Sequence, residues 1–212
     1  MLRDKFTRFL RRGSPLSKFA HIGLDCRISH SAHFEGNVSK IILEDGVSIV
    51  HHVLIHAHKD GGHIRIGART LLKQYVQVMS YPGGHIEVGS DSSVNPFCVL
   101  YGHGGLYIGR QVRIATHTVI IPANHRFKNS QMPISEQGLE RKGIRIEDNV
   151  WIGANCTICD GVTIGSGAVI GAGSVVTRDI PAMTVAVGSP ARPMKSRGPL
   201  APEAQHKKDE DV

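Results

Sequence analysis

The fold is decided by the stretch "NVWIGANCTICDGVTIGSGAVIGAGSVVT", residues 149–177. Within it an aliphatic residue returns at every sixth position, at Ile152, Ile158, Ile164, Ile170 and Val176. Four positions after each of these comes a small or β-branched residue, as at Cys156, Val162 and Ala168. A helix places apolar residues three and four apart, and a half-buried strand alternates them, so neither pattern produces a strict step of six.

The same step continues upstream in groups of three aliphatic residues. The triplets begin at Ile22, Leu43, Ile66, Val88, Ile108, Ile146 and Ile164. Three six-residue sides make one turn of a triangular coil, whose aliphatic residues point inward and which pairs with the next coil at about 4.8 Å. The sequence therefore predicts an all-β fold, a parallel β-helix of about seven triangular coils over residues 22–181.

The composition is typical of such a prism. The 212 residues include 24 Gly but only one Trp and six Phe, which favours flat walls over a core of large side chains. No apolar run approaches the about 18 residues of a membrane-spanning helix, and the N-terminus lacks a secretory pattern, so we expect a cytoplasmic protein. The net charge of +7 favours an anionic ligand such as a phosphate-bearing cofactor. No RNA-binding strand or zinc-finger spacing indicates nucleic acid.

Two short segments flank the repeat. Residues 1–21 combine basic side chains with apolar ones at helical spacing, which predicts a short basic amphipathic helix. We expect it to cap the open end of the prism, as repeat folds require. The alternative is a helix that lies peripherally on the acidic inner membrane surface. Residues 182–212 form a C-terminal segment, and from Ser196 onward mixed charge, Pro and Gly without an apolar period predict a flexible tail.

The repeat is interrupted after "IIPANH", residues 120–125. The next inward aliphatic residue is Ile146, so residues 126–145 are expected to leave the prism as a loop. A long loop inside a tight solenoid is typical of a binding site or an interface. His125 is the last residue before it, on a rigid corner. Because the chain has 13 histidines, position and loop together, not residue type, select His125 as the candidate catalytic base.

Three ordered motifs carry a family resemblance: "NVWIG" (149–153), "VTRDIP" (176–181) and "GSPAR" (188–192). The chain resembles the hexapeptide-repeat acyltransferases, in the branch of galactoside, maltose, nodulation-sugar and streptogramin acetyltransferases. At its N-terminus it is most similar to capsule and lipopolysaccharide O-acetyltransferases. The resemblance implies a left-handed helix, acetyl transfer from acetyl-coenzyme A without a metal, and a homotrimer with active sites between subunits. We expect a saccharide hydroxyl as acceptor, in polysaccharide biosynthesis.

Acetyl transfer to a hydroxyl requires a base, because the hydroxyl is too weak an acid to attack a thioester at neutral pH. An imidazole, whose ordinary pKa is about 6.5, can accept that proton and return it to the departing thiolate. The anionic intermediate also needs a preorganised hydrogen-bond donor. The resemblance assigns the base to His125 and the donor to the backbone N–H of Ala154.

The resemblance implies further binding residues. Asn95 matches an asparagine that orients the acceptor, although an Asn before Pro96 is also typical of a turn. Tyr81 and His103 fall near other acceptor positions. The sugar enzymes tend to carry an acidic residue where His103 stands. An antibiotic or an amino sugar therefore remains an alternative acceptor. The positions implied for coenzyme A are Trp151, Ala154, Ala172, Thr177, Arg192 and Lys195.

Two other functions fit parts of the sequence. The spacing "HHVLIH" (51–56) with His30 upstream resembles gamma-class carbonic anhydrases, in which three imidazoles bind zinc. The candidate ligands would be His30, His51 and His56, but the C-terminal half favours acetyl transfer. A non-enzymatic scaffold is the third hypothesis, and it predicts no binding of coenzyme A. The pair Cys156 and Cys159 does not predict a metal site, because only Cys156 falls in the inward small-residue column.

Overall fold

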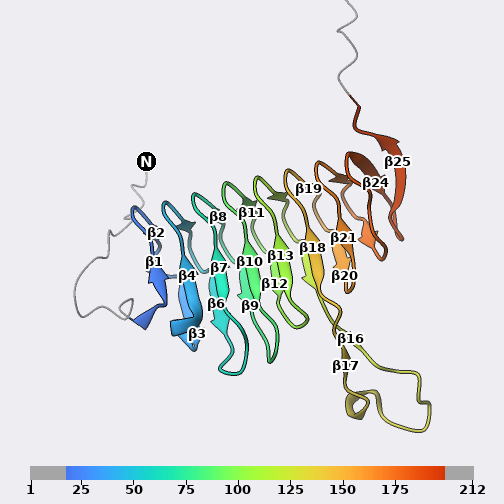
Figure 1. Cartoon of the computed structure of the whole chain (residues 1–212), viewed down its shortest axis with the longest axis horizontal. Coiled ribbons are helices and arrows are strands. Elements are labelled where there is room, and N and C mark those ends of the chain that lie inside the picture. Colours follow the sequence, from blue (N-terminus) through green and yellow to red (C-terminus); the bar gives the residue numbers. More distant parts are fainter. Residues whose placement is uncertain (1–17, 199–212) are drawn as a thin grey trace, which may run out of the picture.

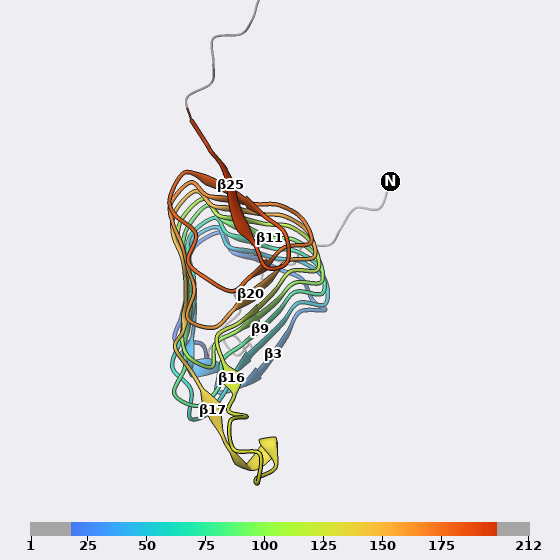
Figure 2. The same cartoon turned by 90° about the vertical axis from the view of Figure 1, so that its right-hand side faces the viewer.

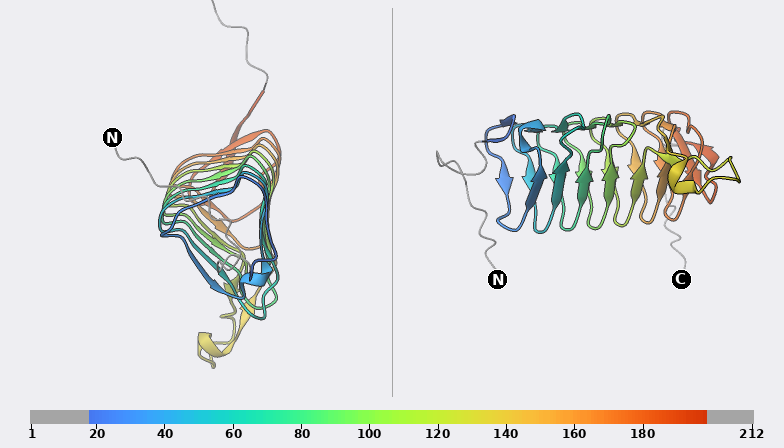
Figure 3. Two further views of the ribbon diagram at one scale, coloured as in Figure 1. Left: turned by 90° about the vertical axis from the view of Figure 1, so that its left-hand side faces the viewer. Right: turned by 90° about the horizontal axis from the view of Figure 1, so that it is seen from below.

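The computed structural model describes residues 18–198, which form a prism of stacked coils (Figure 1). Three parallel sheets, here walls A, B and C, run along the prism and enclose a triangular cross-section (Figure 2). Seven successive coils each contribute one strand to every wall, and the strands of a wall lie in a row along the axis (Figure 3). The predicted parallel β-helix of about seven coils is therefore confirmed, and its left-handed winding stays a prediction.

The strands are short. Wall A contains β1 (His21–Ile22), β4 (Ile41–Leu43), β7 (Ile64–Ile66), β10 (Ile86–Val88), β13 (Leu106–Ile108), β18 (Ile144–Ile146) and β21 (Thr163–Ile164). Wall B contains β2 (Arg27–Ile28), β5 (Ser48–Ile49), β8 (Leu71–Leu72), β11 (Ser93–Val94), β14 (Arg113–Ile114), β19 (Trp151–Ile152), β22 (Val169–Ile170), β24 (Thr184–Val187) and β25 (Arg192–Ser196). Wall C contains β3 (His33–Gly36), β6 (Leu54–Ala57), β9 (Gln77–Met79), β12 (Val99–Tyr101), β15 (Val119–Ile121), β20 (Thr157–Cys159) and β23 (Val175–Val176). The described residues also include the 3-10 turns η2 (Val38–Lys40) and η3 (Ile134–Glu136).

The inward aliphatic residues stack coil on coil in the register that the six-residue step predicts. Leu100 pairs with Ile120 and Ile120 with Ile158, and all three side chains are fully buried. The small-residue column is also buried at Cys98 and Cys156, where a larger side chain would meet the other walls. Burial raises the pKa of the Cys98 thiol to about 11, so this thiol stays protonated.

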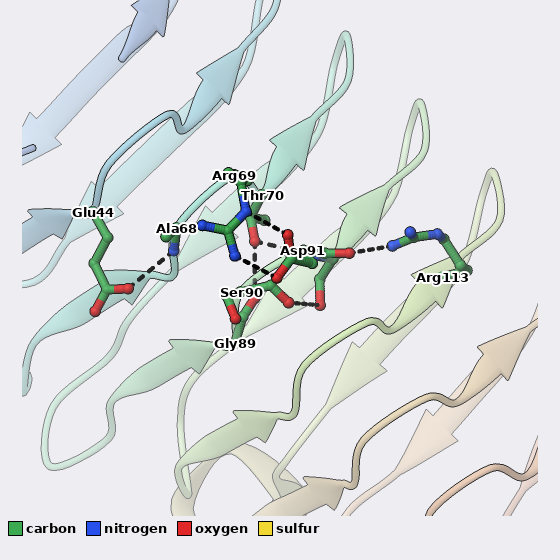
Figure 4. Close-up of polar contacts among 9 residues, drawn as sticks. Glu44, Ala68, Arg69, Thr70, Gly89, Ser90, Asp91 and Arg113 are labelled. Carbon is green, nitrogen blue, oxygen red and sulfur yellow. Dashed lines mark hydrogen bonds and ion pairs between the residues drawn. The ribbon is translucent and has the colours of Figure 1, made fainter. Parts of the chain in front are cut away.

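The corner between walls A and B (corner AB) is polar. Asp91 accepts hydrogen bonds of 2.6 and 2.7 Å from Arg69, and its backbone carbonyl accepts one from Arg113 (Figure 4). Glu44 accepts a bond of 2.9 Å from the Ala68 N–H. The Arg69 guanidinium holds the pKa of Asp91 below its usual range, so this bidentate ion pair persists well into the acid range.

A segment leaves the prism at the corner between walls C and A (corner CA), here called the extruded segment (122–143). Its stem consists of β16 (Asn124–His125) and β17 (Leu139–Glu140), which pair antiparallel and hold the rest away from the coils (Figures 1 and 2). His125 therefore lies on this stem rather than at the end of a prism strand. The prism resumes with β18 at Ile144.

The C-terminal end of wall B extends beyond the sequence repeat. β24 adds parallel to β22, and β25 folds back antiparallel on β24, so the chain from Arg192 to Ser196 is an ordered edge of wall B. Residues 1–17, most of the predicted amphipathic cap, and residues 199–212, most of the predicted tail, lie outside the described residues. Between residues 18 and 198, no helix has the length and apolar character needed to cross a membrane.

Candidate active site

His125 is solvent-exposed on the stem of the extruded segment. It pairs with Leu139 across the antiparallel bridge, which fixes its backbone. The side chain lines a cavity of about 750 Å³ whose walls include Phe127, Met132 and Glu136. An imidazole held in this way is accessible to a substrate and does not point into the prism core, as a general base requires.

Tyr81 and His103, both implied as acceptor positions by the family resemblance, meet at corner CA. Their rings stack with centroids 3.7 Å apart and an angle of 9° between planes. Burial lowers the pKa of His103, and nearby Arg141 and His125 lower it further, so His103 is neutral near pH 7. Its buried Nδ1 has no hydrogen-bond partner within residues 18–198. We therefore assign the proton to Nε2, because a buried N–H without an acceptor is rarer than an unused acceptor.

Two residues that the sequence analysis missed complete this cluster. Tyr101 makes edge contacts with both Tyr81 and His103, at centroid distances of 5.6 and 5.5 Å. Arg141, beyond the stem, donates a hydrogen bond of 2.8 Å to the carbonyl of Pro82 and so ties the extruded segment to an earlier coil. Tyr101 lies on wall C at a position that the six-residue step predicts to point outward. The step predicts nothing for Arg141, because Arg141 lies where the repeat is interrupted.

Ala154, Ala172 and Asn95 lie at the corner between walls B and C (corner BC). The Gly173 N–H donates a hydrogen bond of 2.8 Å to the Ala154 carbonyl, which ties the Ala154 and Ala172 turns together. The Ala154 N–H meets no acceptor inside the described chain. This N–H is thus available to a ligand, as the predicted oxyanion donor must be.

The predicted site residues are divided between two corners of one prism. His125, Tyr81 and His103 lie at corner CA, whereas Ala154 and Asn95 lie at corner BC. Wall C separates the two groups. One chain does not bring the predicted base next to the predicted oxyanion donor.

A basic groove lies on the outer face of wall B. It has a volume of about 650 Å³ and contains Trp151 and Lys195 together with Arg113 and Arg197, and its lining includes no carboxylate. Trp151 is 55% exposed, so its ring is open to a ligand. We call these four residues the basic groove. Neither Arg113, an outward residue of a regular coil, nor Arg197, which follows the last strand, is among the residues predicted from the sequence.

Two residues implied for coenzyme A lie elsewhere. Thr177 follows β23 at corner CA, so it is apart from Ala154 and Ala172 at corner BC. Arg192 pairs with Val187 and donates a hydrogen bond to its neighbour, the Ala191 carbonyl. It does not line the basic groove.

The three candidate zinc ligands do not converge in one chain. His30 and His51 follow strands of wall B, with ring centroids 6.2 Å apart, and His51 Nδ1 lies 2.8 Å from Ser29 Oγ. His56 lies on wall C, with its Nδ1 3.5 Å from a carboxylate oxygen of Glu35. In the part of the chain that the structure describes, no group of three or more His, Cys, Asp or Glu side chains is placed to hold a metal ion.

Comparisons with known proteins agree with this architecture. Residues 143–178 match the family model "Bacterial transferase hexapeptide (six repeats)". WbbJ of Escherichia coli K12, named for an O-acetyl transferase of lipopolysaccharide biosynthesis, is 31% identical over 144 residues, covering 65% of this chain and 74% of WbbJ. Nodulation protein L of Rhizobium meliloti is 40% identical over 111 residues, covering 52% of this chain and 59% of that protein.

Solved structures share the fold. AntD, an N-acyltransferase from Bacillus cereus in complex with dTDP-4-amino-4,6-dideoxyglucose and coenzyme A, superimposes with a TM-score of 0.59 at 23% identity, covering 86% of this chain and 87% of AntD. The chain spans 43% and 54% of the lengths of two further relatives, from Mycobacterium tuberculosis and Schizosaccharomyces pombe. The predicted family is confirmed: this chain belongs to the hexapeptide-repeat acyltransferases.

Proposed function

We propose that the protein is an acetyl-coenzyme A-dependent O-acetyltransferase that acts on a saccharide hydroxyl. The observation that carries this proposal is the placement of His125, an exposed imidazole on a short stem beside the stacked Tyr81 and His103. A base of this kind has the access that proton transfer from an acceptor hydroxyl requires. The name of WbbJ, an O-acetyl transferase of lipopolysaccharide biosynthesis, supports transfer to a saccharide hydroxyl.

The reaction then follows from four groups. His125 takes the proton from the acceptor hydroxyl while the oxygen attacks the thioester carbonyl. The Ala154 N–H of the opposing corner donates to the oxyanion of the tetrahedral intermediate. When the C–S bond breaks, the imidazolium of His125 returns its proton to the thiolate, which leaves as coenzyme A. Asn95, and the Nε2–H of neutral His103, orient the acceptor.

The basic groove supplies the coenzyme site. Its three cations and the exposed ring of Trp151 suit the phosphates and the adenine of a nucleotide, and no carboxylate in the lining opposes them. Lys195, which the family resemblance implies for coenzyme A, meets a phosphate, and Arg113 and Arg197 add to the same positive field. Ala154 and Ala172 line the path of the pantetheine arm along corner BC.

The active site lies between subunits of a homotrimer. Since His125 and Ala154 occupy different corners of one prism, a second copy must bring its corner CA to the first copy's corner BC. Such a contact joins two different surfaces, and repeating it closes into a three-membered ring when each step turns by about 120°.

Release of free thiol from acetyl-coenzyme A tests the function. Purified protein is supplied with acetyl-coenzyme A and a panel of nucleotide sugars, oligosaccharides, amino sugars and hydroxylated antibiotics. We expect acceptor-dependent thiol release with a saccharide, and an ester in the product by mass spectrometry. Transfer to an amine alone would replace O-acetylation by N-acylation, and coenzyme A binding without transfer to any acceptor would favour the scaffold hypothesis.

Trp151 offers a direct measurement of coenzyme binding, because it is the only tryptophan in the chain. We expect coenzyme A to change its fluorescence emission. Arg197→Ala is expected to weaken coenzyme binding about tenfold, since it removes a charge-assisted contact to phosphate. Arg65→Ala is the matched control, because Arg65 pairs with Glu44 on wall A, away from the groove. Equal weakening by both substitutions would mean that only the overall charge matters and that the groove is not the site.

A further inference from the structure

Corner CA carries more hydrogen-bond donors than the described chain uses there. The hydroxyls of Tyr81 and Tyr101 make no hydrogen bond to another group within residues 18–198. Burial, and next the neighbouring Tyr101, raise the pKa of Tyr81, so its hydroxyl keeps its proton. The Nε2–H of His103, whose ring stacks on Tyr81, is a third donor. A ligand rich in hydrogen-bond acceptors therefore suits this corner.

Arg141 adds a positive charge to these donors. Its Nη1 donates a hydrogen bond of 2.8 Å to the Pro82 carbonyl, which anchors the guanidinium against an earlier coil. In the described chain Arg141 makes no ion pair with a carboxylate. Its charge reaches His103, whose pKa is lowered first by burial and then by Arg141 and His125. The remaining N–H groups of the guanidinium form a planar fork that matches a carboxylate or a phosphate.

The cations that follow Arg141 along the chain have acidic partners of their own. Lys142 Nζ lies 3.4 Å from a carboxylate oxygen of Glu140. Arg145 Nε lies 4.0 Å from a carboxylate oxygen of Glu147. Of these three cations, Arg141 is the one without such a partner between residues 18 and 198. Its charge is therefore available to a ligand that carries a negative charge.

The proposed mechanism places a second positive charge at this corner. When His125 takes the proton of the acceptor hydroxyl, its imidazolium lies beside the same His103 that Arg141 adjoins. Among the described residues no carboxylate pairs with His125. Two glutamates line its cavity, but an arginine and a lysine line the cavity as well. A like charge nearby disfavours the imidazolium, whereas a negative charge favours it. An acidic group on the acceptor offsets both positive charges.

We infer that the acceptor is an acidic saccharide, and that Arg141 binds a carboxylate or a phosphate close to the hydroxyl that becomes acetylated. Arg141 is thereby a specificity-determining residue, and the Tyr81 and Tyr101 hydroxyls donate to the same acidic group or to the sugar beside it. The inference rests on the proposed function, because His125 defines where the reacting hydroxyl lies. An amino sugar with a free ammonium group meets positive charge at this corner and is excluded as the acceptor.

Matched pairs of saccharides test the charge requirement. Glucuronic acid is compared with its methyl ester, and a hexose phosphate with the free hexose, so that each pair differs only in the acidic group. Thiol release gives kcat/KM for each, and isothermal titration calorimetry gives binding without any need for transfer. We expect the acidic member of at least one pair to be favoured about tenfold or more, the usual worth of a charge-assisted hydrogen bond. The two pairs distinguish a carboxylate from a phosphate. Equal binding and equal turnover within both pairs would overturn the inference.

Arg141→Gln tests the residue. We expect the acidic-to-neutral ratio of kcat/KM to fall about 10- to 100-fold, mainly through KM of the acidic acceptor, and Arg141→Lys to retain part of the preference. A residue that only ties the extruded segment to Pro82 would slow both members of a pair alike and leave the ratio unchanged. Arg27→Gln is the matched control, because Arg27 is an exposed arginine on wall B of the first coil, and the ratio should stay at its wild-type value. Circular dichroism checks that all variants stay folded.

The two measurements separate this inference from the proposed function. Acetyl transfer to neutral and acidic saccharides alike, with a ratio that Arg141→Gln does not change, would uphold the function and contradict the acidic subsite. Binding of the acidic saccharide that Arg141→Gln weakens, without transfer to any saccharide, would uphold the subsite and count against the function.

Discussion

His125→Ala is expected to lower kcat about 10²–10⁴-fold while binding of acetyl-coenzyme A stays close to that of the wild type. The reason is that in the proposed mechanism the imidazole acts on the proton of the acceptor hydroxyl, whereas the proposed coenzyme site is the basic groove on another surface. Thiol release with a saccharide acceptor measures the first quantity. Trp151 fluorescence measures the second.

Two further variants make this result specific. His125→Asn keeps a polar side chain of similar size but cannot accept and return the proton, so it should be about as slow as His125→Ala. His33→Ala removes another exposed histidine, on the first coil and far along the axis, and should leave kcat unchanged. Thiol release by folded His125→Ala at the wild-type rate would remove His125 from the mechanism.

Ala154→Pro is expected to lower kcat about 10²–10³-fold, the usual effect of deleting one oxyanion donor. Proline removes the backbone N–H and leaves the carbonyl that accepts from Gly173. The turn tolerates proline because Pro96 occupies the same position of corner BC on an earlier coil, followed by Phe97 with positive φ just as Ala154 is followed by Asn155. We therefore expect the loss of activity to come from the missing hydrogen-bond donor and not from a disturbed fold.

Gln74→Pro is the matched control for that substitution. Gln74 occupies the corresponding corner position between Lys73 and Tyr75, where Tyr75 also has positive φ. Its side chain is exposed, and its carbonyl, which accepts from Phe97, is retained. We expect Gln74→Pro to keep its activity. If both proline variants lose activity equally, the effect is conformational and Ala154 has no special role as a donor.

The regular part of the fold is predictable because one physical requirement repeats. Each side of each coil needs an inward aliphatic residue, so Ile28, Leu100 and Ile158 mark the walls directly, and the paired register follows. The interruption after His125 is visible for the same reason: the step of six fails there. Residues that face a shared corner, such as Tyr81 and His103, can be brought together by counting coils.

Features that depend on contacts outside the repeat are not predictable in this way. β25 folds back on β24 after Val176, the last inward residue of the repeat. The six-residue period therefore does not predict that Lys195 and Arg197 lie beside Trp151. The contact of Arg141 with Pro82 depends on the path of the extruded segment. The four rings that stack along corner BC did leave a signal, since each directly precedes a buried inward residue: His52, Tyr75, Phe97 and His117.

The measurement that tests the central claim most directly is complementation between two inactive chains. His125→Ala and Ala154→Pro chains are co-expressed with different tags, and doubly tagged oligomers are isolated. Each mixed three-membered ring contains one junction of three with both wild-type groups, which predicts about a third of the wild-type activity for the isolated doubly tagged rings. If base and donor instead act within one chain, the mixture will be as inactive as either variant alone, and an active site shared between copies will be contradicted.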